Sequence, residues 1–186
     1  MNKKYELTSD RSTIYGNVLY RIRALRDFGD VRTGDLGGWI KSETNLSHEG
    51  DCWVSDNACI YQDARVFGDA KVCGMANIYN HAQVYGNAQV FEDARIFGHS
   101  SVYENAKVYD YSWTSDNVTV CGNSEVFGYS IITGDACIYG DAQVSNVNLF
   151  GTVKIHHGTW NQTVNIHDNY YLISPTLQKI LLGVGY

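Results

Sequence analysis

A six-residue repeat runs unbroken from Cys52 to Val147 and limits the possible folds more than any other feature of the chain. It comprises sixteen units, and residues 64–69, with the sequence Ala-Arg-Val-Phe-Gly-Asp, are representative. The first residue of the unit is Ala in ten of the sixteen, and the third is Val or Ile in every unit except the one that holds Thr114. Self-similarity at a short fixed period predicts a solenoid, in which each repeat buries its apolar face against its neighbours.

Strand alternation explains the chemistry of the repeat. Positions one and three lie on the same face of a strand, so the small and the β-branched residue fill a narrow interior. Position two faces outward and varies freely. Position five is Gly in eight units and otherwise Asp, Asn, Glu or Gln, mostly residues that tolerate the backbone of a sharp corner. Three units then close a triangular coil of eighteen residues, and successive coils stack as parallel strands ~4.8 Å apart.

The repeat resembles that of left-handed β-helix proteins with hexapeptide repeats. More narrowly, the segments that lead into the repeat, residues 27–31, 37–40, 46–47 and 50–53, resemble those of hexapeptide-repeat proteins of bacteria, phages and prophages, which often carry acyltransferase or polymer-forming names. The resemblance implies an all-β fold, a single-stranded left-handed parallel β-helix of about six coils. Its handedness comes from the resemblance alone, because the general rule for parallel crossovers favours right-handed connections.

The residues on either side of the repeat predict two end structures. Residues 5–26 alternate as a β-hairpin or short meander about Gly16-Asn17, and would cap the exposed sheet edge at the N-terminal end. Ser174-Pro175 predicts the start of a short helix over residues 176–182. We expect three parts: residues 1–45 as cap and linker, 46–168 as the solenoid with its first partial coil at Leu46, and 169–186 as a C-terminal extension.

Composition bears on the cellular compartment and on the distribution of charge along the chain. We expect no secretory signal, because no apolar run follows residues 1–4, and no stretch approaches the ~20 apolar residues of a membrane span. The five Cys residues fall in five different columns of the coil, so we expect free thiols in a reducing cytoplasm. Residues 1–41 carry a net charge of +3 and residues 42–186 a net charge of −9. The acidic rod disfavours direct nucleic-acid binding. The acidity of the rod has two possible origins: Asp residues suit the corners of a solenoid, or the rod docks on a basic partner.

Position four holds an aromatic residue in ten of the sixteen units, and by parity these rings point outward. Eighteen-residue stacking predicts three ladders, which either support one another within the sheet or form a surface for a partner or a second subunit. We expect partner-binding residues on this exterior, with the corner carboxylates beside them. The rings and carboxylates are Phe91, Tyr109, Phe127, Tyr61, Tyr79, Phe97, Asp63, Asp69 and Asp135.

His81 and His99 lie one coil apart at a corner, on a column with Asp63 and Asp135. Either both are simple turn residues, or the two imidazoles bind one metal ion together with a third ligand from another subunit. The sequence assigns no catalytic residue, no metal site and no cofactor, since no inserted loop breaks the repeat and no phosphate-binding motif is present.

The leading hypothesis is a non-enzymatic protein-binding scaffold, in its narrowest form a phage-encoded, anti-CRISPR-like inhibitor that occupies a basic nucleic-acid-binding protein. A trimeric, acyl-CoA-dependent acyltransferase is the first alternative, and a structural or polymer-forming protein is the second. A homo-oligomer, dimer or trimer, is compatible with each, and no membrane partner is expected.

Overall fold

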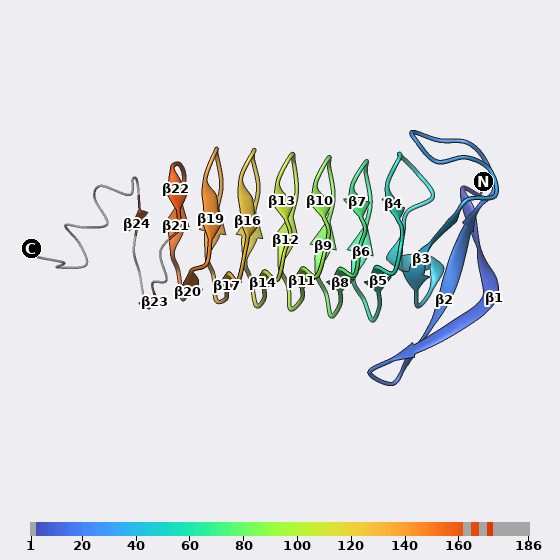
Figure 1. Ribbon diagram of the computed structural model, residues 1–186, viewed down its shortest axis with the longest axis horizontal. Coiled ribbons are helices and arrows are strands. Elements are labelled where there is room, and N and C mark those ends of the chain that lie inside the picture. Colours follow the sequence, from blue (N-terminus) through green and yellow to red (C-terminus); the bar gives the residue numbers. More distant parts are fainter. Residues whose placement is uncertain (1–2, 162–164, 168–170, 173–186) are drawn as a thin grey trace, which may run out of the picture.

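The computed structural model describes residues 3–161, 165–167 and 171–172. Over this range the chain is an all-β parallel solenoid of about seven turns, with almost no helix (Figure 1). Short strands from successive turns build three sheets that run the length of the rod, and each strand pairs with those one turn before and after it. The solenoid follows the eighteen-residue period, as in the parallel pairing of Ile60 with Ile78.

The first sheet contains ten strands and includes the N-terminal segment. Its members, in spatial order, are β1 (Tyr5–Ile14), β2 (Asn17–Ala24), β3 (Leu36–Ile40), β5 (Cys59–Ile60), β8 (Asn77–Ile78), β11 (Arg95–Ile96), β14 (Trp113–Thr114), β17 (Ile131–Ile132), β20 (Asn148–Phe150) and β23 (Asn165–His167). A single 3₁₀ turn, η1 (Glu43–Asn45), follows β3 in the part of the chain that the structure describes.

The other two sheets have seven strands each. The second sheet consists of β4 (Trp53–Val54), β7 (Lys71–Val72), β10 (Gln89–Val90), β13 (Lys107–Val108), β16 (Glu125–Phe127), β19 (Gln143–Ser145) and β22 (Thr159–Trp160). The third sheet consists of β6 (Arg65–Val66), β9 (Gln83–Val84), β12 (Ser101–Val102), β15 (Thr119–Val120), β18 (Cys137–Ile138), β21 (Lys154–Ile155) and β24 (Tyr171–Leu172).

The interior is filled by repeat positions one and three, as the sequence predicts. The Ala residues of position one and the Val and Ile residues of position three have essentially no solvent exposure. Ser replaces Ala at four of these positions, and at three of them the hydroxyl has a local acceptor: Ser112, Ser124 and Ser130 donate to the carbonyls of Tyr109, Cys121 and Phe127, each at 2.7 Å. The fourth, Ser100, has a buried hydroxyl with no hydrogen-bond partner among the described residues. A buried hydroxyl is tolerated when it is hydrogen-bonded, so the first three substitutions leave the packing intact.

Repeat position five turns each corner with a positive φ. Where it is not Gly, its side chain can accept the position-five N–H one turn later: Glu92 Oε2 accepts from Asp110 N at 3.0 Å, and Asp110 Oδ2 accepts from Gly128 N at 2.8 Å. This bond offsets the cost of a left-handed conformation in a residue with a Cβ. The acidity of the rod is therefore tied to corner chemistry.

The expected count of about six coils is wrong, and so is the expected start of the solenoid at Leu46. Ile40 of β3 already pairs in parallel with Ile60, upstream of Leu46, and Leu46 itself bridges to Val66 in repeat position three rather than position one. The misplacement arises because extra residues between Leu46 and Val54 lengthen that turn.

The turns become shorter near the C-terminal end of the repeat, first by one residue and then by two. Ile131 pairs with Asn148, one residue short of the full period, and Val144 pairs with Trp160, two short. The parallel sheets continue through both irregularities into β23 and β24.

The N-terminal segment forms an antiparallel pair, β1 with β2, and β2 then pairs antiparallel with β3. The strict alternation predicted for residues 18–25 is wrong, because the register shifts between Arg21 and Arg23. Leu19 and Ile22 are consequently both buried, while Val18 is exposed. That this hairpin protects the end of the rod from pairing with other chains stays a prediction.

The helix predicted over residues 176–182 lies outside the described residues. None of the helical structure that is described has the length and apolar character needed to cross a membrane.

Candidate functional site

The β1–β2 hairpin leans along the outer face of the first sheet instead of stacking only on its end (Figure 1). Leu19 from the hairpin packs with Cys59 and Tyr61 of the solenoid in a second, smaller apolar cluster. Ile14 near the hairpin tip and Tyr79 one turn further along pack against the same cluster. The hairpin thus converts an outward-facing strip of the sheet into a covered one.

The hairpin turn itself is tight. Tyr15 and Gly16 both have positive φ, at 48° and 78°, as a two-residue type I′ turn requires. The Asn17 side-chain amide donates to the carbonyls of Ile14 and Tyr15, at 3.4 and 3.3 Å. This conformation holds the Tyr15 side chain over the solenoid, where it is 81% exposed.

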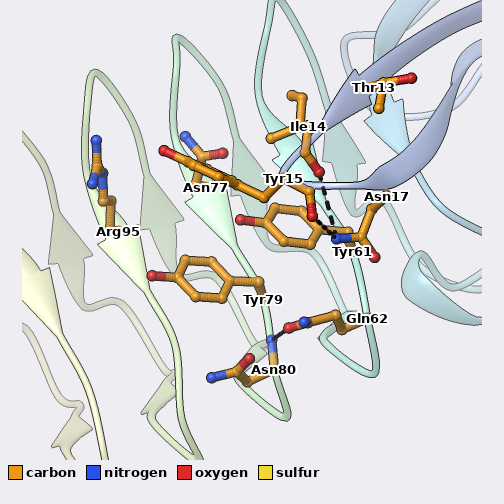
Figure 2. A pocket seen from close by; sticks show the side chains of 10 residues that line it. All are labelled: Thr13, Ile14, Tyr15, Asn17, Tyr61, Gln62, Asn77, Tyr79, Asn80 and Arg95. Atoms are coloured by element: carbon orange, nitrogen blue, oxygen red, sulfur yellow. Dashed lines mark hydrogen bonds between the residues drawn. The ribbon is translucent and has the colours of Figure 1, made fainter.

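A pocket of about 520 Å³ lies between the hairpin tip and the outer face of the first sheet (Figure 2). Three tyrosines, four amide side chains and one arginine make up most of its wall. The lining residues are Thr13, Ile14, Tyr15, Asn17, Tyr61, Gln62, Asn77, Tyr79, Asn80 and Arg95. In the close view Tyr61 and Tyr79 lie side by side, with Tyr15 above them and Arg95 across the opening. The size is within the range of small-molecule sites.

The electrostatics of this pocket follow from its lining. Burial raises the pKa of Tyr61 and of Tyr79 above the ordinary value for a phenol, and the neighbouring Tyr15 adds to the rise while the Arg95 charge opposes it. The phenols are therefore protonated and able to donate hydrogen bonds at neutral pH. Arg95 supplies the one formal charge in the lining. Its guanidinium lies over the Trp113 ring, 4.9 Å from the centroid.

A second hollow, of about 420 Å³, adjoins the first at the corner of the solenoid. The two hollows share Gln62 and Asn80, which are joined by a 2.8 Å hydrogen bond from Asn80 N to Gln62 Oε1. Lys41, Asp63, Gly98 and the two stacked rings of His81 and His99 complete the second lining. The imidazole centroids are 4.8 Å apart, which confirms the predicted one-coil spacing.

His81 has a carboxylate near one of its ring nitrogens, and both side chains are more than half exposed. Its Nδ1 lies 3.7 Å from Asp63 Oδ2, an ion-pair distance when the ring is protonated. Among the described residues, no group of three or more His, Cys, Asp or Glu side chains is arranged to hold a metal ion.

The predicted aromatic ladders are present. Ring centroids in the predicted pairs lie 4.7–5.1 Å apart with nearly parallel planes; the pairs are Tyr61–Tyr79, Tyr79–Phe97, Phe67–Tyr85, Tyr85–Tyr103, Phe91–Tyr109 and Tyr109–Phe127. Most of the rings are half-buried against one another, and Tyr61 is only 3% exposed because the hairpin covers it. Their role in partner binding stays a prediction.

The predicted carboxylates belong to the solenoid corners. Asp63 faces His81, Asp135 Oδ1 accepts from Asn117 Nδ2 at 2.8 Å, and Asp69 Oδ1 accepts from Asp51 N at 2.8 Å. The structure thus gathers Tyr61, Tyr79 and Asp63 around the two hollows, and places the other predicted residues along the rod.

Sequence reasoning missed Tyr15, Arg95 and the most exposed aromatic strip of the rod. That strip consists of Tyr111, Tyr129 and Trp113; the two tyrosines stack at 5.1 Å, and Tyr129 is 70% exposed. The tyrosines occupy repeat position six, where no other unit has an aromatic residue, and this departure was the available signal. No comparable signal marks Tyr15, whose importance depends on where the hairpin lies.

These features define the class of the protein: a parallel β-solenoid of the hexapeptide-repeat type, with turns of about eighteen residues and a pocket beneath an N-terminal hairpin. No family model matches the chain. A segment of 54 residues is 50% identical to a protein of Escherichia coli (strain K12) named "Uncharacterized acetyltransferase YdcK". The matched segment covers 28% of this chain and 17% of that relative, so the chain matches well under two thirds of the relative's length.

Proposed function

We propose that this protein is an acyltransferase that uses a thioester donor of the acyl-CoA class, with His81 as the general base. The observation that carries the proposal is the His81–Asp63 pair in a hollow that adjoins a small-molecule pocket. The name of the E. coli relative supports the same class of reaction. The sequence favoured a scaffold without enzymatic activity, and both observations favour its enzymatic alternative.

In this mechanism the acceptor lies in the pocket and presents an amine or hydroxyl toward the corner. The ring nitrogen of His81 that does not face Asp63 removes a proton from the amine or hydroxyl of the acceptor. The nitrogen or oxygen of that group attacks the thioester carbonyl at the same time. Asp63 stabilises the imidazolium that results, and the donor's thiolate then leaves and takes that proton from His81, which restores the base. The hairpin supplies the pocket wall, so no inserted loop in the repeat is needed for substrate binding.

The test is release of free thiol from acetyl-CoA in the presence of a panel of small amines and alcohols. We expect saturable turnover, with kcat reduced about 10²- to 10⁴-fold by His81→Ala, the range typical of a general base. Asn117→Ala is the matched control, because it lies in the same corner column but outside both hollows. Absence of turnover across the panel, or equal turnover by His81→Ala and the wild type, would contradict the proposal.

A protein-binding role is the second candidate, and the exposed strip of Tyr111, Trp113 and Tyr129 favours it. Its narrower form, an anti-CRISPR-like inhibitor with a basic partner, rests on the acidity of the rod and on the resemblance to phage and prophage proteins. Many of those acids bond to backbone N–H groups of the next turn, which gives their presence a structural reason.

A further inference from the structure

We propose that the pocket beneath the hairpin binds a small organic anion, a carboxylate or a phosphate monoester, with its charged group at Arg95. The inference rests on the proposed function in one respect: the bound anion would be the acyl acceptor. The binding itself is measured without any acyl donor.

The charge of the lining supports an anionic ligand. Ten residues line the pocket, and Arg95 is the one that carries a formal charge, so the wall has a net charge of +1. The whole chain has a net charge of −6, which makes a positive, carboxylate-free pocket a local exception. An arginine without a carboxylate partner in the pocket is suited to an oxyanion, which it binds through two parallel hydrogen bonds.

The uncharged part of the lining completes the anion site. The phenol hydroxyls of Tyr15, Tyr61 and Tyr79 can donate hydrogen bonds to an oxyanion in the space between the three rings and Arg95 (Figure 2). Ring edges and Ile14 provide apolar surface for the body of the ligand. An organic anion with a flat or compact body matches this combination better than a free inorganic ion, which would leave the apolar wall in contact with water.

Three of the proposed anion-binding side chains, those of Tyr61, Tyr79 and Arg95, are held in place by other rings. Tyr61 stacks on Tyr79 at 5.1 Å, Tyr79 stacks on Phe97 at 4.9 Å, and Arg95 lies over Trp113. These contacts restrict the side-chain rotamers before a ligand arrives, which lowers the entropic cost of binding. Gln62 and Asn80 line both this pocket and the hollow that holds His81, so an anion anchored at Arg95 would lie next to that hollow.

The experiment is titration calorimetry with four probes of similar shape: benzoate, phenyl phosphate, benzamide and benzylamine. We expect the two anions to bind about tenfold or more tightly than neutral benzamide, as charge-assisted hydrogen bonds predict. Preference for phenyl phosphate would assign a phosphate ester, and preference for benzoate would assign a carboxylate. Equal binding of anions and benzamide, or binding by none of the probes, would overturn the proposal.

Two variants locate the binding. Arg95→Gln should remove the preference for anions, whereas Arg65→Gln should keep it, because Arg65 occupies the same repeat position on the third sheet and lies outside this pocket. Tyr15→Asn should weaken anion binding while leaving the fold intact, since Asn tolerates the positive φ of that turn residue. Unchanged affinity in both Arg95→Gln and Tyr15→Asn would place the anion elsewhere and refute the inference.

The outcome is separable from that of the proposed reaction. His81→Ala should retain anion binding even though it loses turnover. If anions bind at Arg95 but no acyl transfer is found, the pocket stands and the acyltransferase proposal fails. If acyl transfer is found but Arg95→Gln leaves the KM for every active acceptor unchanged, the acyltransferase stands and the anion site fails.

Discussion

Cys59 and Trp113 hold the same position of the repeat, on the same sheet, three turns apart, yet Cys59 is 3% exposed and Trp113 is 39% exposed. The repeat gives both residues an outward-facing strand position. The difference comes from the β1–β2 hairpin, which covers β5 and leaves β14 open. The exposure of an outward-facing residue therefore depends on whether another segment covers it, whereas the repeat alone buries the inward-facing residues.

The largest loss of stability should come from a substitution in the interior, which is buried equally beneath the covered strand β5 and the open strand β14. Val84→Asp places an unpaired charge in a packed interior and should unfold the rod. Gln83→Asp, one residue away and exposed, should change the free energy of unfolding by about 0.5 kcal/mol or less. Thermal melts followed by circular dichroism measure both, and equal melting temperatures would contradict the strand register.

The covered and open regions should respond differently to loss of a large apolar side chain. Leu19→Ala removes packing between the hairpin and the solenoid and should cost about 2–4 kcal/mol. Trp113→Ala removes an exposed ring and its contact with Arg95, and should cost about 1 kcal/mol or less. Urea denaturation gives both values. Equal costs would mean that the hairpin contributes little to the stability of the covered region.

A smaller effect should appear at high pH. Burial raises the pKa of the Cys59 thiol to about 11, so the folded state favours the neutral thiol. This contribution is complete below the ordinary thiol pKa of about 9 and is lost as the pH rises through 11, and its size should be below about 2 kcal/mol. Cys59→Ser should therefore reduce the fall in stability between pH 9 and pH 11. A fall of the same size in both proteins would show that the hairpin does not shield this thiol.

The interior of the fold could be predicted from the sequence, because Ala and Val or Ile recur at fixed places and strand alternation assigns them to one face. The aromatic ladders and the His81–His99 spacing follow from the same period. The count of about six turns was too low because the spacing departs from eighteen residues at both ends of the repeat. Extra residues follow Leu46, and the turns after Val147 are short.

The candidate site could not be predicted, for a physical reason. Its wall combines Tyr15 from a hairpin turn with Arg95 from a solenoid strand, and these residues are far apart in the sequence. Their place in one pocket wall depends on the direction in which the hairpin leaves the end of the rod. That direction is set by the burial of Leu19 and by a register shift in β2, neither of which has a periodic signature.

The dependence of each turn on its immediate neighbours also has a consequence for how the chain folds. Backbone bonds along the rod join residues about one turn apart, so contacts form locally and structure can extend one coil at a time. The hairpin end buries additional side chains that do not belong to the repeat and is the natural place for the first coils to order. Folding should then proceed from that end toward the C-terminus, each finished coil serving as the template for the next.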